Sequence, residues 1–225
     1  EKFGKTAYLL YDKGVEYTTL LGEYFKQAFT DLGGTVVLED SYDDKATDFA
    51  AQIAKVKALP EQPAFYYVAA MPYNVGTVVK QFRDAGITGP IIGGDGYDDP
   101  SWIAAANDVY FSAHALNDPD AGSEAYKKFY EAYTKEYGHA PENAFAALGY
   151  DSVFLFADAL KRANATDGQA IKTALEATKD FPGITGSISY TAEQHVPQKG
   201  VTIIALKDGK YTLGAEIVPT KIPAP

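Results

Sequence analysis

The chain has 225 residues, 46% of them hydrophobic, and its 30 acidic and 20 basic side chains give a formal net charge of −10. This composition is typical of a globular protein with a substantial core, and an acidic surface repels phosphate backbones, which excludes nucleic acid as a general partner. Cysteine is absent, which excludes disulfides and thiolate metal sites, and no run approaches the ~18 apolar residues of a membrane span, so direct membrane insertion is not expected.

Strands and helices are predicted to alternate over the first half of the chain. Apolar or β-branched runs predict strands at 5–11, 35–38, 64–69, 90–92 and 109–112. Apolar residues at helical spacing predict helices at 17–32, 49–56 and 74–82, the third of them capped by Asn74. Strand–helix–strand units of this length predict an α/β fold, a doubly wound parallel sheet with helices on both faces.

The second half is richer in helix. Amphipathic patterns predict helices over 123–137, 143–163 and 167–178, followed by short strands at 187–190, 201–206 and 211–213. Along the helix at 143–163, Phe145, Leu148, Val153 and Phe156 form an apolar stripe. Three prolines at or after residue 218 predict an extended tail.

Three loops are the places where function is expected. Ligands of open parallel sheets bind beyond the carboxyl ends of the strands, which here are 11–17, 70–74 and 93–100. The last loop reads GGDGYDDP; it fits neither the dinucleotide fingerprint nor the P-loop, and its acidic residues repel phosphate. Two interpretations stay open: a tight turn with solvated aspartates, or a turn that aims Asp95 into a cleft to receive an ammonium group.

No catalytic constellation is visible, so an enzyme is not expected. His114, His139 and His195 are scattered, without the spacing of a zinc site or a catalytic triad. Asp12 closes the first strand, but the second acidic residue that a phosphoacceptor site would need beside it is missing. Neither a cofactor nor a metal is therefore expected.

Five stretches, taken in order and spacing, resemble the type I periplasmic binding proteins, and within them the branched-chain amino-acid-binding, LivJ-like receptors of ABC importers. They read YDKGVEY, LGGTVVLEDSY, TDFAAQIAKVKA, KQFRDAGITGPIIGGDG and ALGYDSVFLFADALKRA. The resemblance implies two lobes, each with a doubly wound parallel sheet, that close on a ligand between them. It assigns 1–115 to the second lobe, 116–200 to a mostly helical return segment of the first lobe, and 201–225 to the last crossover and final second-lobe strands with the tail. The opening part of the first lobe has no counterpart before Glu1, so that lobe is expected to be incomplete.

The resemblance also implies a set of ligand-binding residues. These are Tyr17, Met71, Tyr73, Asp95, Tyr97, Phe145 and Tyr150. Tyr17 matches a tyrosine that packs on the ligand, Asp95 the acidic residue that pairs with the ligand ammonium, and Phe145 an aromatic at the start of the return helix. Met71 and Tyr73 match the pocket loop after the third strand.

The implied function is that of an extracytoplasmic solute-binding protein of an ABC importer. It would bind an amino acid or a related small carboxylate-bearing ligand and deliver it to a membrane permease, in the periplasm or outside the cell, free or as an anchored lipoprotein. Two alternatives remain: a ligand-sensing domain of a receptor or regulator with the same fold, and a flavodoxin-like α/β enzyme, which would need a phosphate-binding loop. The apolar stripe of the helix at 143–163 further predicts that the chain self-associates or pairs with the missing part of the first lobe.

Overall fold

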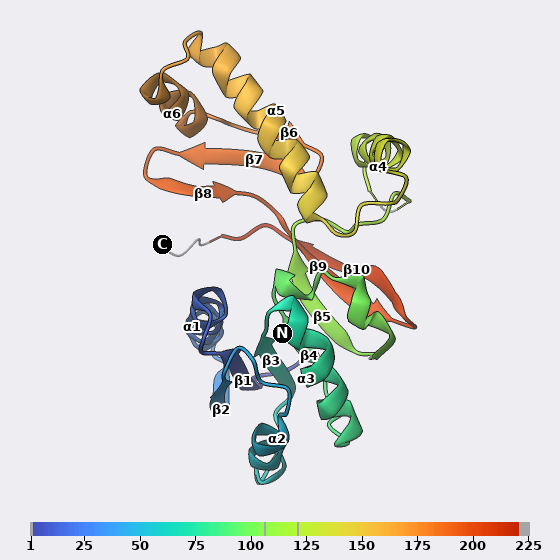
Figure 1. The fold of residues 1–225 in the computed structure, drawn as a ribbon. Coiled ribbons are helices and arrows are strands. Elements are labelled where there is room, and N and C mark those ends of the chain that lie inside the picture. Colours follow the sequence, from blue (N-terminus) through green and yellow to red (C-terminus); the bar gives the residue numbers. More distant parts are fainter. Residues whose placement is uncertain (1, 106, 121, 221–225) are drawn as a thin grey trace. The chain divides into compact units, whose positions relative to one another are not determined.

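The chain folds as two compact units, which are coloured along the sequence in Figure 1. The computed structural model describes residues 2–105, 107–120 and 122–220, so part of the predicted tail, 221–225, lies outside the described residues. Unit 1 comprises Glu1–Ser112 and Ile204–Gly214, and unit 2 comprises Ala113–Ile203 and Ala215–Pro225. The backbone therefore passes from one unit to the other three times, after residues 112, 203 and 214.

A seven-stranded sheet, in the order β10-β9-β5-β4-β3-β1-β2, organises unit 1. Its strands are β1 (Thr6–Asp12), β2 (Thr35–Tyr42), β3 (Phe65–Ala69), β4 (Ile91–Gly93), β5 (Val109–Ala113), β9 (Val201–Lys207) and β10 (Lys210–Ile217). The strand pairs β1–β2, β1–β3, β3–β4 and β4–β5 are all parallel. This sheet confirms the predicted α/β fold class, and the parallel pairing places the carboxyl ends of these strands at one edge.

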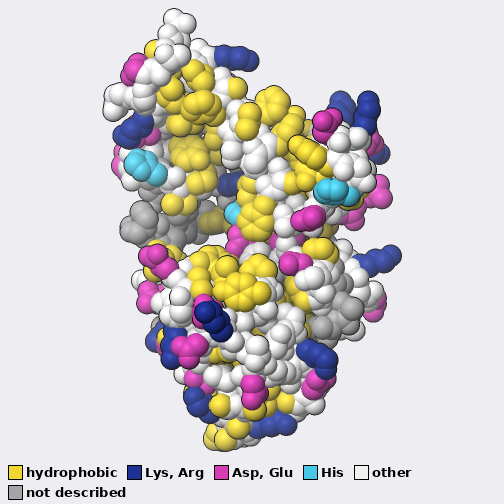
Figure 2. Space-filling model, in the orientation of Figure 1, with side chains coloured by type: hydrophobic (Ala, Val, Ile, Leu, Met, Phe, Trp, Pro, Cys, Tyr) yellow, Lys and Arg dark blue, Asp and Glu magenta, His cyan; other side chains and the backbone are white. Residues whose placement is uncertain are grey.

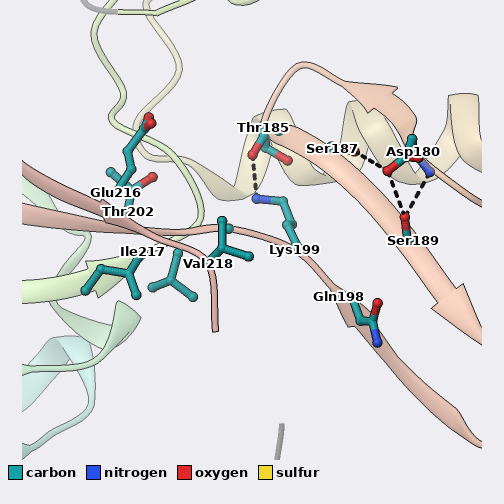
Figure 3. A pocket seen from close by; sticks show the side chains of 13 residues that line it. Asp180, Thr185, Ser187, Ser189, Gln198, Lys199, Thr202, Glu216, Ile217 and Val218 are labelled. Carbon is teal, nitrogen blue, oxygen red and sulfur yellow. Dashed lines mark hydrogen bonds between the residues drawn. The ribbon is translucent and has the colours of Figure 1, made fainter. Parts of the chain in front are cut away.

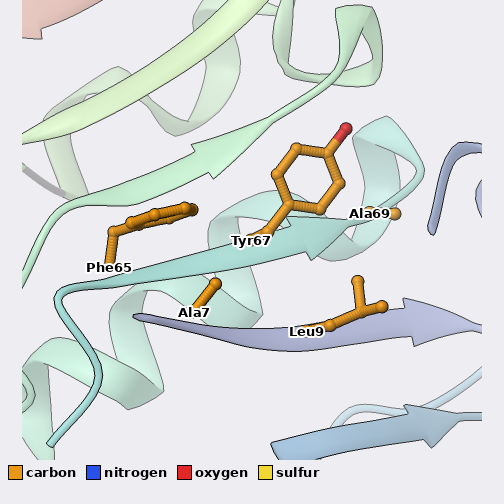
Figure 4. Close-up of a cluster of buried hydrophobic side chains, with 5 residues drawn as sticks. All are labelled: Ala7, Leu9, Phe65, Tyr67 and Ala69. Atoms are coloured by element: carbon orange, nitrogen blue, oxygen red, sulfur yellow. The ribbon is translucent and has the colours of Figure 1, made fainter. Parts of the chain in front are cut away.

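Helices cover both faces of this sheet. Successive strand residues point to opposite sides, and consecutive residues of β1 and β3 are buried, so each face has apolar side chains to cover. On one face, Ala7, Leu9, Phe65, Tyr67 and Ala69 form a buried cluster, shown in Figure 4. The helix α1 (Glu16–Asp31) packs on this cluster, and its Phe25 ring stacks on Tyr67 with centroids 3.8 Å apart. On the other face, Tyr8 and Tyr66 contact Phe82 of α3 (Pro72–Asp84), and Tyr42 contacts Phe49 beside α2 (Ala50–Lys57).

The start of α3 differs from the sequence-based expectation. The helix begins at Pro72 with Met71 as its N-cap, so Asn74 lies inside the first turn and does not cap it. Proline is favoured in the first turn because its missing N–H has no helical partner there. Asn74 is buried instead, and its Nδ2 donates to the Ala46 carbonyl over 3.2 Å, which ties α3 to the loop after β2.

The described part of unit 2 contains three helices and a small antiparallel sheet. The helices are α4 (Glu124–Tyr137), α5 (Phe145–Ala163) and α6 (Gly168–Glu176), and the strands are β6 (Phe181–Gly183), β7 (Gly186–Thr191) and β8 (Gln194–Gln198). Ser123 and Asp167 cap α4 and α6 through their side chains, as their sequence positions suggest. Sequence patterns missed β6 and β8, since both are short and both contain proline. Within the described residues, no helix combines the length and the apolar character that crossing a membrane requires.

One side of α5 is both apolar and exposed. The helix buries Ala147, Asp151, Leu155 and Ala159, while other apolar side chains face outward. Among the exposed ones are Phe145, Tyr150, Val153, Phe154 and Phe156, with Val153 67% accessible. Figure 2 shows apolar side chains gathered on the surface in the region of α5. No charged residue lies between 145 and 157 other than the buried Asp151, so this face lacks the charged side chains of a solvated helix surface.

The exposed face of α5 predicts self-association of the chain. Contiguous apolar surface of this kind marks an interaction site in a soluble protein. We expect sedimentation velocity to show a concentration-dependent increase in mass. Replacing Val153 and Phe156 with glutamate should abolish that increase, whereas replacing Lys161 with glutamate, on the same helix, should leave it unchanged. A chain that stays monomeric over the whole concentration range would contradict this prediction.

Candidate functional site

Two of the predicted residues meet at the carboxyl edge of the unit 1 sheet. Tyr17 lies in the first turn of α1, and Asp95 begins η1 (Asp95–Tyr97), the short 3₁₀ turn after β4. The Tyr17 hydroxyl donates a short hydrogen bond to Asp95 Oδ1, and it accepts one from the Gly96 backbone N–H over 3.3 Å. The side chains are 78 positions apart in sequence, and the parallel strand order brings their loops together.

Glycines allow this close approach. A Cβ on Gly94 would lie 2.7 Å from the Tyr17 hydroxyl oxygen and 2.6 Å from Leu21 Cδ2. A Cβ on Gly96 would lie 2.4 Å from the carbonyl oxygen of Ala70, in the loop after β3. The glycine-rich loop therefore serves backbone packing, and this packing presents the Asp95 carboxylate beside Tyr17.

The electrostatics of the site keep its two tyrosines neutral. Burial, the hydrogen bond to Asp95 and its negative charge together raise the pKa of the Tyr17 phenol. Burial and the Asp95 charge likewise raise the pKa of the Tyr67 phenol. Both phenols are therefore protonated and neutral at physiological pH, and the carboxylate can accept hydrogen bonds from a cationic group.

We expect Gly94→Ala to weaken the site, because the new methyl group would push the Tyr17 hydroxyl away from Asp95. Losing one hydrogen bond to a charged group costs about 1.5–3 kcal/mol, which corresponds to a roughly tenfold or larger loss of affinity for an ammonium-bearing ligand. Titration calorimetry measures this loss. Gly149→Ala is the matched control, since a Cβ at Gly149 meets nothing within 4 Å; equal weakening by both substitutions would contradict the assignment.

Met71 and Tyr73, the predicted residues of the loop after β3, do not form part of the Tyr17–Asp95 pair. Met71 stands at the N-cap of α3, next to Ala70, which contacts the Gly96 turn. Tyr73 is 61% exposed and lines a groove of about 800 Å³ along α3, where burial and the charges of Asp12 and Asp44 raise its pKa. Neither Tyr17 nor Asp95 lines that groove.

Tyr97, another predicted ligand-binding residue, lies in the core of unit 1. Its side chain is fully buried, and its hydroxyl donates to the Val68 carbonyl over 3.0 Å. Its ring meets Trp102 edge-on, with centroids 5.5 Å apart. The aromatic packing and the hydroxyl bond to Val68 account for this position.

Phe145 and Tyr150 both belong to α5 in unit 2. Phe145 is exposed at the start of the helix, and its ring lies 6.1 Å from that of His114. Tyr150 packs against Phe129 of α4 and Phe154, with ring centroids 5.2 Å and 4.5 Å apart. Packing thus accounts for the position of the Tyr150 ring, whereas the Phe145 side chain remains exposed.

Sequence reasoning missed Tyr67 and Leu21 as neighbours of the pair. Tyr67 is the third residue of β3, and the Asp95 charge raises the pKa of its phenol. Leu21 lies one turn after Tyr17 on α1. Phe65, Tyr67 and Ala69 are two residues apart and share the face of the sheet that α1 covers. Strand periodicity therefore could have predicted that Tyr67 faces α1.

Asp12 is a second unusual group at the same edge of the sheet. It is completely buried, its Oδ1 accepts the Gly14 N–H over 2.9 Å, and its Oδ2 has no hydrogen-bond partner among the described residues. Burial raises its pKa, and the charges of Asp44 and Asp43 raise it further, against the effect of the Gly14 bond. Asp12 is therefore a locally destabilising carboxylate when it is ionised.

We expect Asp12→Asn to increase the free energy of unfolding at pH 7, because the amide carries no charge that burial and the neighbouring Asp44 and Asp43 disfavour. The pKa of Asp12 is higher in the folded state, so the folded protein binds this proton more tightly and gains stability as the pH falls toward the unfolded-state pKa. The advantage of the variant should therefore vanish at acidic pH. Urea unfolding from pH 4 to 8 tests this, with the exposed Asp48→Asn as control, because asparagine can still accept the Ala50 N–H there; a pH-independent difference would contradict the prediction.

Comparison with known proteins places the chain in a family. A family model described as "Periplasmic binding protein" matches residues 1–210. The Leu/Ile/Val-binding protein BraC3 of Rhizobium johnstonii is 25% identical over 207 residues, which cover 92% of this chain and 55% of that protein. The chain thus spans about half the length of the curated relatives it matches.

Solved structures agree with this match. The leucine-binding protein LivK of Thermotoga maritima is 30% identical with a TM-score of 0.84, covering 96% of this chain and 61% of that one. LivJ of Streptococcus pneumoniae, a branched-chain amino acid transporter substrate-binding protein in complex with isoleucine, is 30% identical with a TM-score of 0.79, covering 96% and 60%. A solute-binding protein of an ABC transporter from Rhodopseudomonas palustris, in complex with 3,4-dihydroxybenzoic acid, is 26% identical with a TM-score of 0.76, covering 97% and 62%. These relatives are binding proteins and not enzymes, and the chain belongs to the periplasmic binding protein family.

Proposed function

We propose that this chain binds an amino acid as the solute receptor of an ABC importer, and that Asp95 receives the ligand ammonium. The observation that carries the proposal is the Tyr17–Asp95 pair, a carboxylate oriented by a neutral phenol at the carboxyl edge of the sheet. In such a receptor the ligand passes to a membrane permease on the outer side of the cytoplasmic membrane, in the periplasm or outside the cell.

The charge of the site favours amino acids over aromatic acids. Relatives bind either class, since one solved structure holds isoleucine and another 3,4-dihydroxybenzoic acid. A benzoate brings a negative charge and no ammonium, so the Asp95 carboxylate repels it. An α-amino acid offers both charges, and its ammonium forms a charge-assisted hydrogen bond with the carboxylate.

A ligand series tests this proposal on the chain as it is. Two-dimensional NMR detects weak binding and resolves the amide signals of Gly94 and Gly96 beside the site. We expect leucine, isoleucine or valine to shift these signals, and 4-methyl-2-oxopentanoate, which replaces the leucine ammonium with a carbonyl oxygen, to leave them in place. Equal shifts with the oxo acid or with benzoate would overturn the proposal.

A further inference from the structure

The first two passages between the units have their unit 2 ends close together. The first passage lies within β5, after Ser112, and the second lies within β9, which begins at Val201 and crosses after Ile203. β5 and β9 are neighbours in the sheet, and they run in opposite directions, since β5 leaves unit 1 and β9 enters it. The end of β5 and the start of β9 therefore lie side by side.

Lys199 joins the chain segments just beyond that point. Its Nζ donates a hydrogen bond of 2.9 Å to the carbonyl oxygen of His114, one residue past the end of β5. The same ammonium donates to the carbonyl oxygen of Thr185, in the turn between β6 and β7, as Figure 3 shows. One side chain thus connects the segment before β9 with the segment after β5 and with the small sheet of unit 2.

Thr185 in turn is fixed to α5. The buried Asp151 accepts hydrogen bonds from the Thr185 N–H over 2.9 Å and from the Thr185 hydroxyl over 2.6 Å. Burial lowers the pKa of the Lys199 ammonium, and the Asp151 charge acts in the opposite direction. The ammonium is therefore part of a partly buried network that reaches from both passages to a helix of unit 2.

Open space borders the same segments on another side. A cavity of about 610 Å³ in unit 2 is lined by Lys199, Gly200 and Thr202, and also by Glu216 and Ile217, which follow the third passage (Figure 3). Side chains do not fill the space next to these segments, so packing there restrains them weakly. The hydrogen bonds of Lys199 are a specific restraint on these segments, and they join them to the small sheet of unit 2.

We infer that Lys199 is the positioning residue of the hinge: it makes the unit 2 ends of the first two passages part of the rigid body of unit 2. Bending between the units is then confined to the few residues nearer to unit 1. Without the ammonium, the segments at 114 and 199–202 would move independently of α5, and the range of orientations between the units would widen. The inference does not depend on which solute the protein binds.

Spin-label distance measurement tests the inference. Because the chain has no cysteine, the labels attach only at the two introduced cysteines. Lys57→Cys in α2 and Lys161→Cys in α5, both exposed, place one label in each unit. Dilution with excess unlabelled chain restricts the signal to distances within one molecule. We expect Lys199→Met to broaden the distance distribution and Lys199→Arg, which keeps a charged donor, to restore a narrower one.

Control variants separate this role from general stability. Lys179 also donates to a backbone carbonyl of unit 2, that of Tyr190 over 3.0 Å, but it lies on no passage, so Lys179→Met should leave the distribution unchanged. Lys199→Gln, which keeps one short donor, is the second variant if Lys199→Met does not fold, and it should broaden the distribution as well. An unchanged width in a folded Lys199→Met or Lys199→Gln variant would overturn the inference, whereas failure of leucine to bind would bear only on the proposed function.

Discussion

Asp95→Asn lowers the affinity for leucine by roughly 30-fold or more, if Asp95 receives the ligand ammonium. Truncating one partner of a close charge pair costs about 2–5 kcal/mol, and 1.4 kcal/mol is about tenfold in Kd. The asparagine keeps an oxygen at Oδ1 for the Tyr17 hydroxyl, so the loop geometry persists and only the charge is removed. Titration calorimetry, or NMR where binding is weak, measures the change.

Asp99→Asn is the matched control for this substitution. It removes the same charge from the same loop, and the asparagine oxygen can still accept the Ser101 N–H that Asp99 Oδ1 binds over 2.8 Å. We expect its affinity to stay close to that of the unsubstituted chain. If Asp95→Asn and the unsubstituted chain bind leucine equally well, Asp95 is not the ammonium partner and its carboxylate has only a local structural role.

Asp151→Ala has the largest expected effect on stability. Asp151 Oδ1 accepts the Ile184 N–H over 2.8 Å, and Oδ2 accepts both donors of Thr185. A Cβ on Gly183 would lie 2.6 Å from Oδ2, so the carboxylate fits closely against the turn between β6 and β7. Removing it leaves three buried or half-buried donors without an acceptor, and at about 1–3 kcal/mol each this lowers the free energy of unfolding by about 3 kcal/mol or more.

Two probes can assign that loss to unit 2. The single tryptophan, Trp102, lies in unit 1, so its fluorescence follows that unit, whereas far-UV circular dichroism follows the helices of both units. Urea unfolding of Asp151→Ala should shift the dichroism transition more than the fluorescence transition. Asp158→Ala, on the same helix, removes an exposed i,i+4 ion pair with Arg162 and should cost only about 0.3–0.5 kcal/mol. Equal effects of the two substitutions would contradict the role given to Asp151.

Local patterns predicted the elements near the site well. The strands β1, β3 and β5 are buried, and their apolar runs are visible without any tertiary information. The expectation that ligands bind at the strand ends led directly to Asp95, because a parallel sheet collects those ends at one edge. The resemblance to a known family named Tyr17 as a residue that packs on the ligand, but it did not pair Tyr17 with Asp95.

Side-chain direction within the loops could not be predicted in the same way. Tyr97 follows Asp95 by two residues, yet it turns into the core and bonds the Val68 carbonyl. Asn74 has the residue type of a helix cap, but Pro72 starts the helix earlier and leaves Asn74 bound to the Ala46 carbonyl. Both outcomes depend on backbone atoms that are distant in sequence, which a local pattern does not contain.

The sequence by itself determined the α/β class, the order of strands and helices in the first half, and the loops that form the candidate site, since all three follow from short-range periodicity and chain punctuation. Only the tertiary structure decided that the Tyr17 hydroxyl meets Asp95, that Asp151 holds the turn at Thr185, and that Lys199 reaches back to His114 across 85 positions. These are polar contacts between residues far apart along the chain. Their partners are specified by how the elements pack, because a hydrogen bond depends on distance and direction that residue type alone does not set.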